Sequence, residues 1–189
     1  YKRQVEVIAD KTANPDFIAA DFLSQAEHGA DSQAILVTSS EEIVAPVIEA
    51  IQEQLSKLSR KEITEKALDH SRIIVLKDEQ EVIDFTNMYA PEHLIIQTAN
   101  YTHIAGQIEN AGSVFMGPYT PESAGDYASG TNHTLPTNGY AKAYSGVNLD
   151  SFIKKITFQE ITAEGIKNLG ETIQIMAGNE QLDAHRNAV

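Results

Sequence analysis

One stretch of the chain holds an unusual density of side chains that can do acid–base or metal chemistry. It runs from Pro121 to His133 and carries acidic, imidazole and hydroxyl groups with two glycines, but almost nothing that could fill a core. Glycine lets a backbone approach a ligand closely, while Asp126 and His133 bring a charge and a titratable base. We interpret the stretch as a loop that lines a site, in preference to a capped surface turn.

A second candidate follows Pro91, where a helix must end before a strand begins. Glu92 and His93 come directly after it, at the mouth of that strand, where open α/β sheets commonly keep their sites. A carboxylate and an imidazole at such a junction could share acid and base work. Taken alone, the pair could equally belong to a solvated turn.

Gln25 and His28 lie three positions apart near the end of the first predicted helix, so they share a face. They could form a metal-ligand pair, with imidazole as the natural donor, or simply a polar helix end. Glu180 and His185 near the C-terminus indicate little by themselves. Because the chain has no Cys, any metal must be held by His, Asp, Glu or amide oxygens.

The composition restricts the classes of partner. The 189 residues suit one soluble domain with a small appendage, and 14 Lys and Arg against 27 Asp and Glu give a net charge of -13. No basic patch appears in the sequence, so nucleic acid is not an expected partner. No apolar run approaches the roughly 20 residues of a membrane span and no signal-like segment opens the chain, so we expect a cytoplasmic protein without membrane contact.

Short β-branched runs alternate with helical patterns through most of the chain. Strands are predicted over residues 5–9, 34–38, 72–76, 94–97 and 113–116. Helices are predicted to begin at Asn14, at the capping run Ser39–Glu42 and at Asp78. The alternation predicts an α/β fold of Rossmann-like type, a mostly parallel sheet flanked by helices. No G-x-G-x-x-G follows the first strand, so the fold brings no dinucleotide fingerprint with it.

The pattern changes after His133. We expect a long ordered loop, a short helix, a strand and a longer helix, over residues 135–146, 149–155, 156–161 and 163–178. The chain is therefore divided into a Rossmann-like α/β domain at 1–147 and a small helical C-terminal extension with its tail at 148–189. The tail has too little apolar content to pack alone, so we expect it to dock on another surface.

Several motifs together closely resemble histidinol dehydrogenase. They are Pro121–His133, Ala90–Leu94, Ser113–Gly117, Ser24–Gln33 and the ending Ala184–Val189. The resemblance covers almost the whole chain from about Val5 onward. It implies oxidation of L-histidinol through the aldehyde to L-histidine, in histidine biosynthesis, by a zinc-containing homodimer that uses NAD.

The resemblance also implies a role for each site residue. Glu92 and His93 would be the acid/base pair, with His93 taking the alcohol proton and Glu92 activating the water that adds to the aldehyde. The zinc ligands would be Gln25, His28, Asp126 and His185. The substrate contacts would be Gln25, His28, His93, Asp126, His133, Glu180 and His185. The tail with Glu180 and His185 would reach into the partner subunit's site.

By the same resemblance, the chain corresponds to the C-terminal part of the family's protein. The N-terminal part, with the domain that supplies the NAD contacts, would be missing, and Arg3 stands where the family has a serine that touches substrate. One alternative is a non-catalytic remnant that binds metal or pairs with a partner chain, and would take up zinc without reducing NAD. Another is a zinc hydrolase in which Glu92 activates a metal-bound water, which would need no NAD.

Overall fold

The structure is a computed structural model that describes residues 3–189, so Tyr1 and Lys2 of the predicted 1–147 domain lie outside the described residues. The chain forms two compact units, one that ends at Ser151 and one that comprises Phe152–Val189. Over the described residues, no helix combines the length and the apolar character that crossing a membrane requires.

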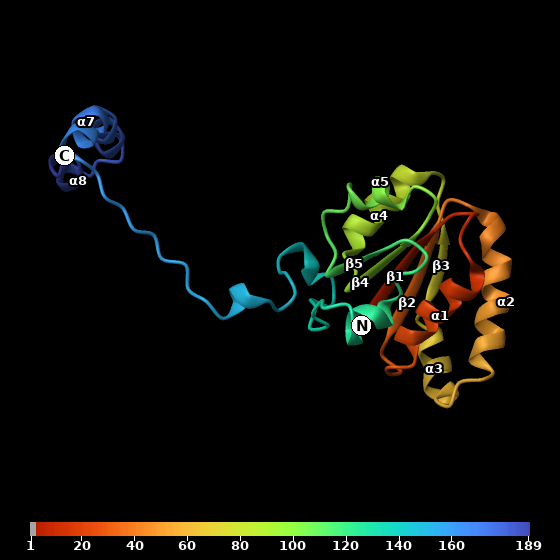
Figure 1. Ribbon diagram of the computed structural model, residues 1–189. Helices are drawn as coiled ribbons and strands as arrows, with labels where there is room; N and C mark the ends of the chain where they lie inside the picture. The colour runs from red at the N-terminus through yellow and green to blue at the C-terminus, as the bar shows by residue number, and fades with distance from the viewer. Residues whose placement is uncertain (1–2) are drawn as a thin grey trace. The chain divides into compact units, whose positions relative to one another are not determined.

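A five-stranded parallel sheet forms the centre of the first unit (Figure 1). Its spatial order is β3-β2-β1-β4-β5, and every neighbouring pair is parallel. The strands are β1 (Gln4–Ala9), β2 (Gln33–Thr38), β3 (Arg72–Val75), β4 (His93–Gln97) and β5 (Ser113–Met116). Strands β1, β2 and β4 are buried along their whole length, as expected of strands covered on both faces. The predicted α/β fold is confirmed.

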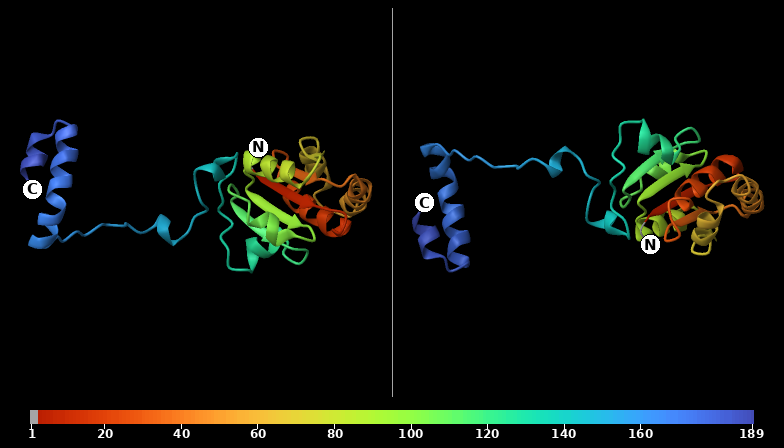
Figure 2. Two further views of the ribbon diagram at one scale, coloured as in Figure 1. Left: turned by 90° about the horizontal axis from the view of Figure 1, so that it is seen from above. Right: turned by 90° about the horizontal axis from the view of Figure 1, so that it is seen from below.

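Helices cover both faces of this sheet, as the two views in Figure 2 show. On one face lie α1 (Pro15–Ala26), α2 (Val44–Leu55) and α3 (Lys61–Leu68), and on the other lie α4 (Glu79–Tyr89) and α5 (Tyr101–Ala105). Successive strand residues point to opposite faces, so the sheet separates two apolar cores. Val7, Leu36 and Ile95 belong to the core under α1 and α2, whereas Ile8, Ile35 and Ile96 belong to the core under α4 and α5.

Two of the three predicted helix caps are confirmed. The side chain of Asn14 accepts a hydrogen bond from the backbone N–H of Asp16, and that of Asp78 accepts from Glu81. The predicted capping run Ser39–Glu42 instead leads into a 3-10 turn, Glu41–Ile43, before α2, and the Ser40 side chain makes no cap bond within the described chain. The backbone N–H of Ser40 is bonded to the Thr38 hydroxyl.

The Pro121–His133 stretch is not a loop throughout, contrary to the prediction. Its first part forms a short helix, α6 (Glu122–Tyr127). The prediction of a strand over residues 156–161 is also wrong, because those residues are extended without a partner strand in the sheet. A 3-10 turn, Leu149–Ser151, replaces the helix predicted over 149–155. Helices α7 (Ala163–Asn179) and α8 (Asp183–Asn187) make up most of the second unit.

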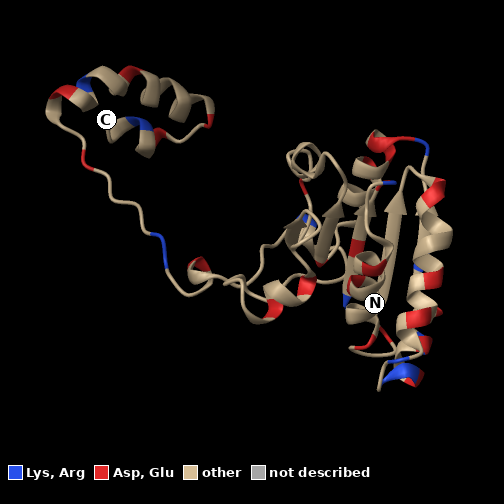
Figure 3. Ribbon diagram, turned by 45° about the vertical axis from the view of Figure 1, so that its right-hand side comes forward, with Lys and Arg blue, Asp and Glu red and all other residues tan. Residues whose placement is uncertain are grey.

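Glu6 is an acid buried in the middle of the central strand, in a chain where acidic residues outnumber basic ones (Figure 3). Burial raises the pKa of Glu6 to about 8, although its hydrogen bond with Thr86 opposes the shift. The Thr86 hydroxyl pairs with both Glu6 and the carbonyl of Val82. The other carboxyl oxygen, Oε2 of Glu6, has no hydrogen-bond partner among the described residues, so the buried acid is only partly bonded and its ionised form is disfavoured.

This burial predicts that the free energy of unfolding falls as the pH rises. In the unfolded chain Glu6 loses its proton near pH 4.5, whereas in the folded chain it keeps the proton to about pH 8. Across that window the unfolded state is favoured progressively. Glu6→Gln stays neutral and can still bond to Thr86, so its stability should decline less steeply, with a gain of several kcal/mol over the unsubstituted chain at pH 8.

Urea denaturation of both proteins at pH 5 and pH 8 measures this difference. Glu49→Gln, on the exposed side of α2, is the matched control and should leave the slope of stability against pH unchanged. Equal slopes for Glu6→Gln and the unsubstituted chain would contradict the prediction.

Candidate active site

The candidate site lies at the amino edge of the sheet, where β1 and β4 begin. Val5 of β1 pairs with His93, the first residue of β4. Glu92 and His93 lie at the start of β4, the strand mouth where we predicted them, although the sites of open α/β sheets commonly lie at the opposite, carboxyl edge. A helix that follows a parallel strand returns to the amino edge, and α1 thereby brings Gln25 and His28 to this end of the sheet.

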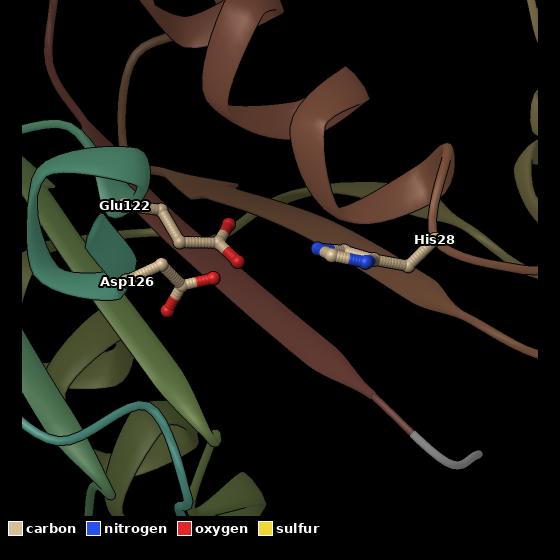
Figure 4. A group of neighbouring side chains, drawn as sticks. All are labelled: His28, Glu122 and Asp126. Atoms are coloured by element: carbon tan, nitrogen blue, oxygen red, sulfur yellow. The ribbon is translucent and has the colours of Figure 1, made fainter.

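Three side chains lie close enough to hold one metal ion. They are His28, Glu122 and Asp126, whose possible ligand atoms are all within 4.8 Å of one another. His28 points from just beyond α1 toward the two carboxylates on α6 (Figure 4). Glu122 and Asp126 are four residues apart on one helix and so share a face. The sequence interpretation missed Glu122 because it treated this helix as a loop.

His93 is the buried centre of the site, with 1% of its side chain exposed. Its Nε2 lies 3.5 Å from Oδ1 of Asp126, and its Nδ1 lies 3.7 Å from Oε1 of Glu122. Burial lowers the pKa of His93, and the charge of Asp126 opposes that shift. A neutral imidazole beside carboxylates can accept a proton and be stabilised in the charged form that results.

Gln25 is fully buried and contacts the same imidazole. Its Nε2 lies 3.4 Å from Nδ1 of His93. Its Oε1 has no hydrogen-bond partner among the described residues, which is costly for a buried amide oxygen. An unpartnered amide oxygen on a residue that contacts His93 fits a metal ligand, and nitrogen and oxygen donors without sulfur suit zinc.

Glu92 directly precedes His93, the first residue of β4. Oε2 of Glu92 accepts a hydrogen bond of 3.0 Å from the backbone N–H of Gln4. Burial raises the pKa of Glu92 to about 7, while that N–H and the charge of Arg3 oppose the shift. Glu92, Arg3 and His133 line one hollow, so the structure brings the predicted His133 beside the predicted base. A carboxyl group with such a pKa can exchange protons near neutral pH.

Glu122 is the most heavily desolvated of the acids around His93. Burial raises its pKa to about 8, the hydroxyl of Ser24 lowers it, and the neighbouring Asp126, Asp21 and Glu92 raise it further. Acids that crowd together away from water repel one another when ionised. A cation held among them would remove that repulsion.

Glu180 and His185 lie in the second unit. Glu180 follows α7, His185 lies in α8, and both are exposed. Their predicted contribution to the site stays a prediction, as does the pairing of the tail with a partner subunit.

Residues 3–189 match the sequence model of the family described as histidinol dehydrogenase. The histidinol dehydrogenase of Bacteroides fragilis (strain YCH46) is 63% identical over 186 residues, which are 98% of this chain and 44% of the relative. That of Bacteroides thetaiotaomicron is 64% identical over the same shares. The crystal structure of histidinol dehydrogenase from Elizabethkingia anophelis matches with a TM-score of 0.94 and 57% identity, over 100% of this chain and 43% of that one. This chain spans less than half the length of these relatives.

The packing of α6 generates a prediction about Gly125, which lies between the two acids on that helix. A Cβ added at Gly125 would lie 2.7 Å from Cζ of the buried Phe115 ring, so α6 would have to move. Although alanine favours helices, Gly125→Ala should lower the free energy of unfolding by about 1–3 kcal/mol. It should also weaken zinc binding, because Glu122 and Asp126 move with the helix.

Thermal unfolding and titration with zinc measure the two effects. Adding Phe115→Leu removes the clashing ring atoms and should restore most of the zinc affinity. Gly106→Ala is the control, because its Cβ would meet its neighbours at an ordinary 3.5 Å. Unchanged zinc affinity in Gly125→Ala would contradict this account of the packing.

Proposed function

Because the chain belongs to the histidinol dehydrogenase family, we propose that it provides the metal-holding and acid–base part of an enzyme that oxidises L-histidinol to L-histidine with NAD. The observation that carries the proposal is the meeting of His28, Glu122 and Asp126 around one point next to His93. The family's place in histidine biosynthesis agrees with it. The NAD contacts are proposed to lie in the part of the relatives that this chain does not span.

The donor set supports zinc as the metal. His28, Asp126 and the unpartnered oxygen of Gln25 would hold it, with Glu122 beside them and His185 as a further proposed ligand. When bound, zinc would act as a Lewis acid that anchors the imidazole and amino nitrogens of the substrate. This anchoring leaves the proton transfers to the side chains of the chain itself.

His93 is the proposed base for oxidation of the alcohol. Oxidation removes a hydride from carbon, which passes to NAD, and a proton from the hydroxyl oxygen. The imidazole of His93, whose pKa burial lowers, is neutral and takes that proton. Asp126, 3.5 Å away, stabilises the imidazolium that forms.

Glu92 is the proposed base for the second oxidation. Water must add to the aldehyde before the second hydride can leave, and Glu92 takes the proton of that water. Its pKa of about 7 places it near half ionisation at neutral pH, and the backbone N–H of Gln4 holds its carboxylate in place. His133, Glu180 and His185 are proposed substrate contacts, and a homodimer is the proposed assembly.

The ligand and base assignments predict different results for different substitutions. Asp126→Ala and His185→Ala should each lose bound zinc, because each removes a proposed ligand. His93→Ala should keep zinc and lower alcohol oxidation at least ~100-fold, the usual effect of removing a general base. Metal analysis of the purified proteins tests the first part, and retained zinc in the two ligand variants would contradict the assignment.

Activity is measured by mixing the chain with the N-terminal portion of the Bacteroides fragilis relative and following NADH formation from L-histidinol. We expect two NADH for each L-histidinol consumed. Zinc uptake without any NADH would favour the non-catalytic alternative, which the Arg3 departure also supports. Hydrolysis of a test ester without NAD would favour the hydrolase.

A further inference from the structure

A polar stripe runs along one face of α1 and faces the site. Asp21, Ser24 and Gln25 lie at positions i, i+3 and i+4 of the helix, which adjoin, and His28 follows just beyond its end. Gln25 and His28 are proposed metal ligands, but Asp21, at the start of the stripe, touches no proposed ligand atom through its own side chain. It is nevertheless 4% exposed, and a buried carboxylate must be bonded to persist.

The carboxylate of Asp21 joins three elements. Its Oδ1 accepts a hydrogen bond of 3.2 Å from the backbone N–H of Glu122 at the start of α6. Its Oδ2 accepts one of 3.2 Å from Nε2 of Gln97 at the end of β4. The backbone carbonyl of Asp21 also accepts a hydrogen bond from the hydroxyl of Ser24. That hydroxyl lies 3.1 Å from Oε2 of Glu122. Helix α1, strand β4 and helix α6 therefore meet at this one side chain.

Helix α6 depends on this contact because it lacks a cap of its own. The first backbone N–H groups of a helix need an acceptor, which usually comes from a Ser, Thr, Asp or Asn side chain at the preceding residue. The residue at that position is Pro121, which has no side-chain acceptor and makes no cap bond. Asp21 takes over the role of the cap from another helix, and its negative charge also suits the start of a helix.

We propose that Asp21 is a positioning residue that sets the distance between the acids of α6 and His28 beside α1. Glu122 and Asp126 are carried by a helix of six residues, too short to be fixed by its own backbone bonds alone. With the cap removed, the backbone of α6 loses its bond to α1 and only the contact of Ser24 with the Glu122 carboxylate remains, so the ligand atoms lose their common spacing. The inference rests on the proposed metal-binding function.

The test compares substitutions at Asp21 in the full chain. Asp21→Ala removes both hydrogen bonds and should weaken zinc binding by ~10- to 100-fold, as expected for a group that orients metal ligands. Asp21→Asn should stay within ~3-fold of the unsubstituted chain, since its Oδ1 can still accept from Glu122. Its Nδ2 can donate to Oε1 of Gln97, which has no hydrogen-bond partner in the described chain, once that amide rotates.

Zinc affinity is measured by competition with a chromophoric chelator, and the absorption of bound cobalt reports the ligand geometry. Asp16→Ala is the matched control, because it removes an exposed carboxylate from the same helix without touching α6. A second readout needs no metal: hydrogen exchange at the amide of Glu122 should be ~10-fold faster or more in Asp21→Ala than in Asp21→Asn.

Equal zinc affinity in Asp21→Ala and the unsubstituted chain would overturn the inference while leaving the proposed function intact. A loss of affinity in Asp21→Asn as large as that in Asp21→Ala would also overturn it. Absence of zinc binding by the unsubstituted chain would overturn both. If Asp21→Ala does not fold, Asp21→Ser replaces it, since that hydroxyl can bond to its own helix but is too short to cap α6.

Discussion

The site depends on acidic side chains being held together where little water reaches them. Asp21, Glu92 and Glu122 all have pKa values raised by burial, and each lies close to Asp126 or to another of the group. Such an arrangement is unfavourable for ionised carboxylates unless protons or a cation offset the repulsion. The acidic cluster lowers the free energy of unfolding, and burial of apolar side chains in the two cores must offset that loss. The site therefore depends on both cores.

The position at the amino edge of the sheet follows from the same electrostatics. Helix α1 ends at Ala26, and the carbonyl groups of its last turn carry partial negative charge toward His28 and the space beyond it. A cation is favoured next to such a helix end. The chain thus places the end of α1 and two carboxylates around the same point. His93, at the start of β4, lies beside them on the side of the sheet.

Much of the scaffold could be predicted from the sequence because its strands and caps are local features. The β-branched runs that became β1 and β2, and the caps Asn14 and Asp78, are determined by neighbouring residues. Helix α6 could not be predicted in that way, because Ser, Gly, Asp and Tyr are weak helix formers and its cap comes from Asp21, 101 residues away. The four-residue spacing of Glu122 and Asp126 could have indicated that the two acids share a face. That inference requires knowing that the segment is a helix. The strand predicted over residues 156–161 was wrong because the local pattern alone was used. An alternating apolar pattern forms a strand only beside a partner strand, and these residues have none in the sheet.

The second unit poses a different problem, because it has almost no core. Ala177 is its one buried hydrophobic residue, whereas Phe158, Ile175 and Met176 are among those exposed. Burial of apolar surface is the main source of stability, so two helices with one buried alanine gain little from packing on each other. Most apolar side chains of Phe152–Val189 are therefore not covered within the unit, which agrees with our expectation that the tail docks on another surface. The proposed roles of Glu180 and His185 depend on that surface, because exposed side chains on a unit without a core can be held in a fixed geometry only by what the unit packs against.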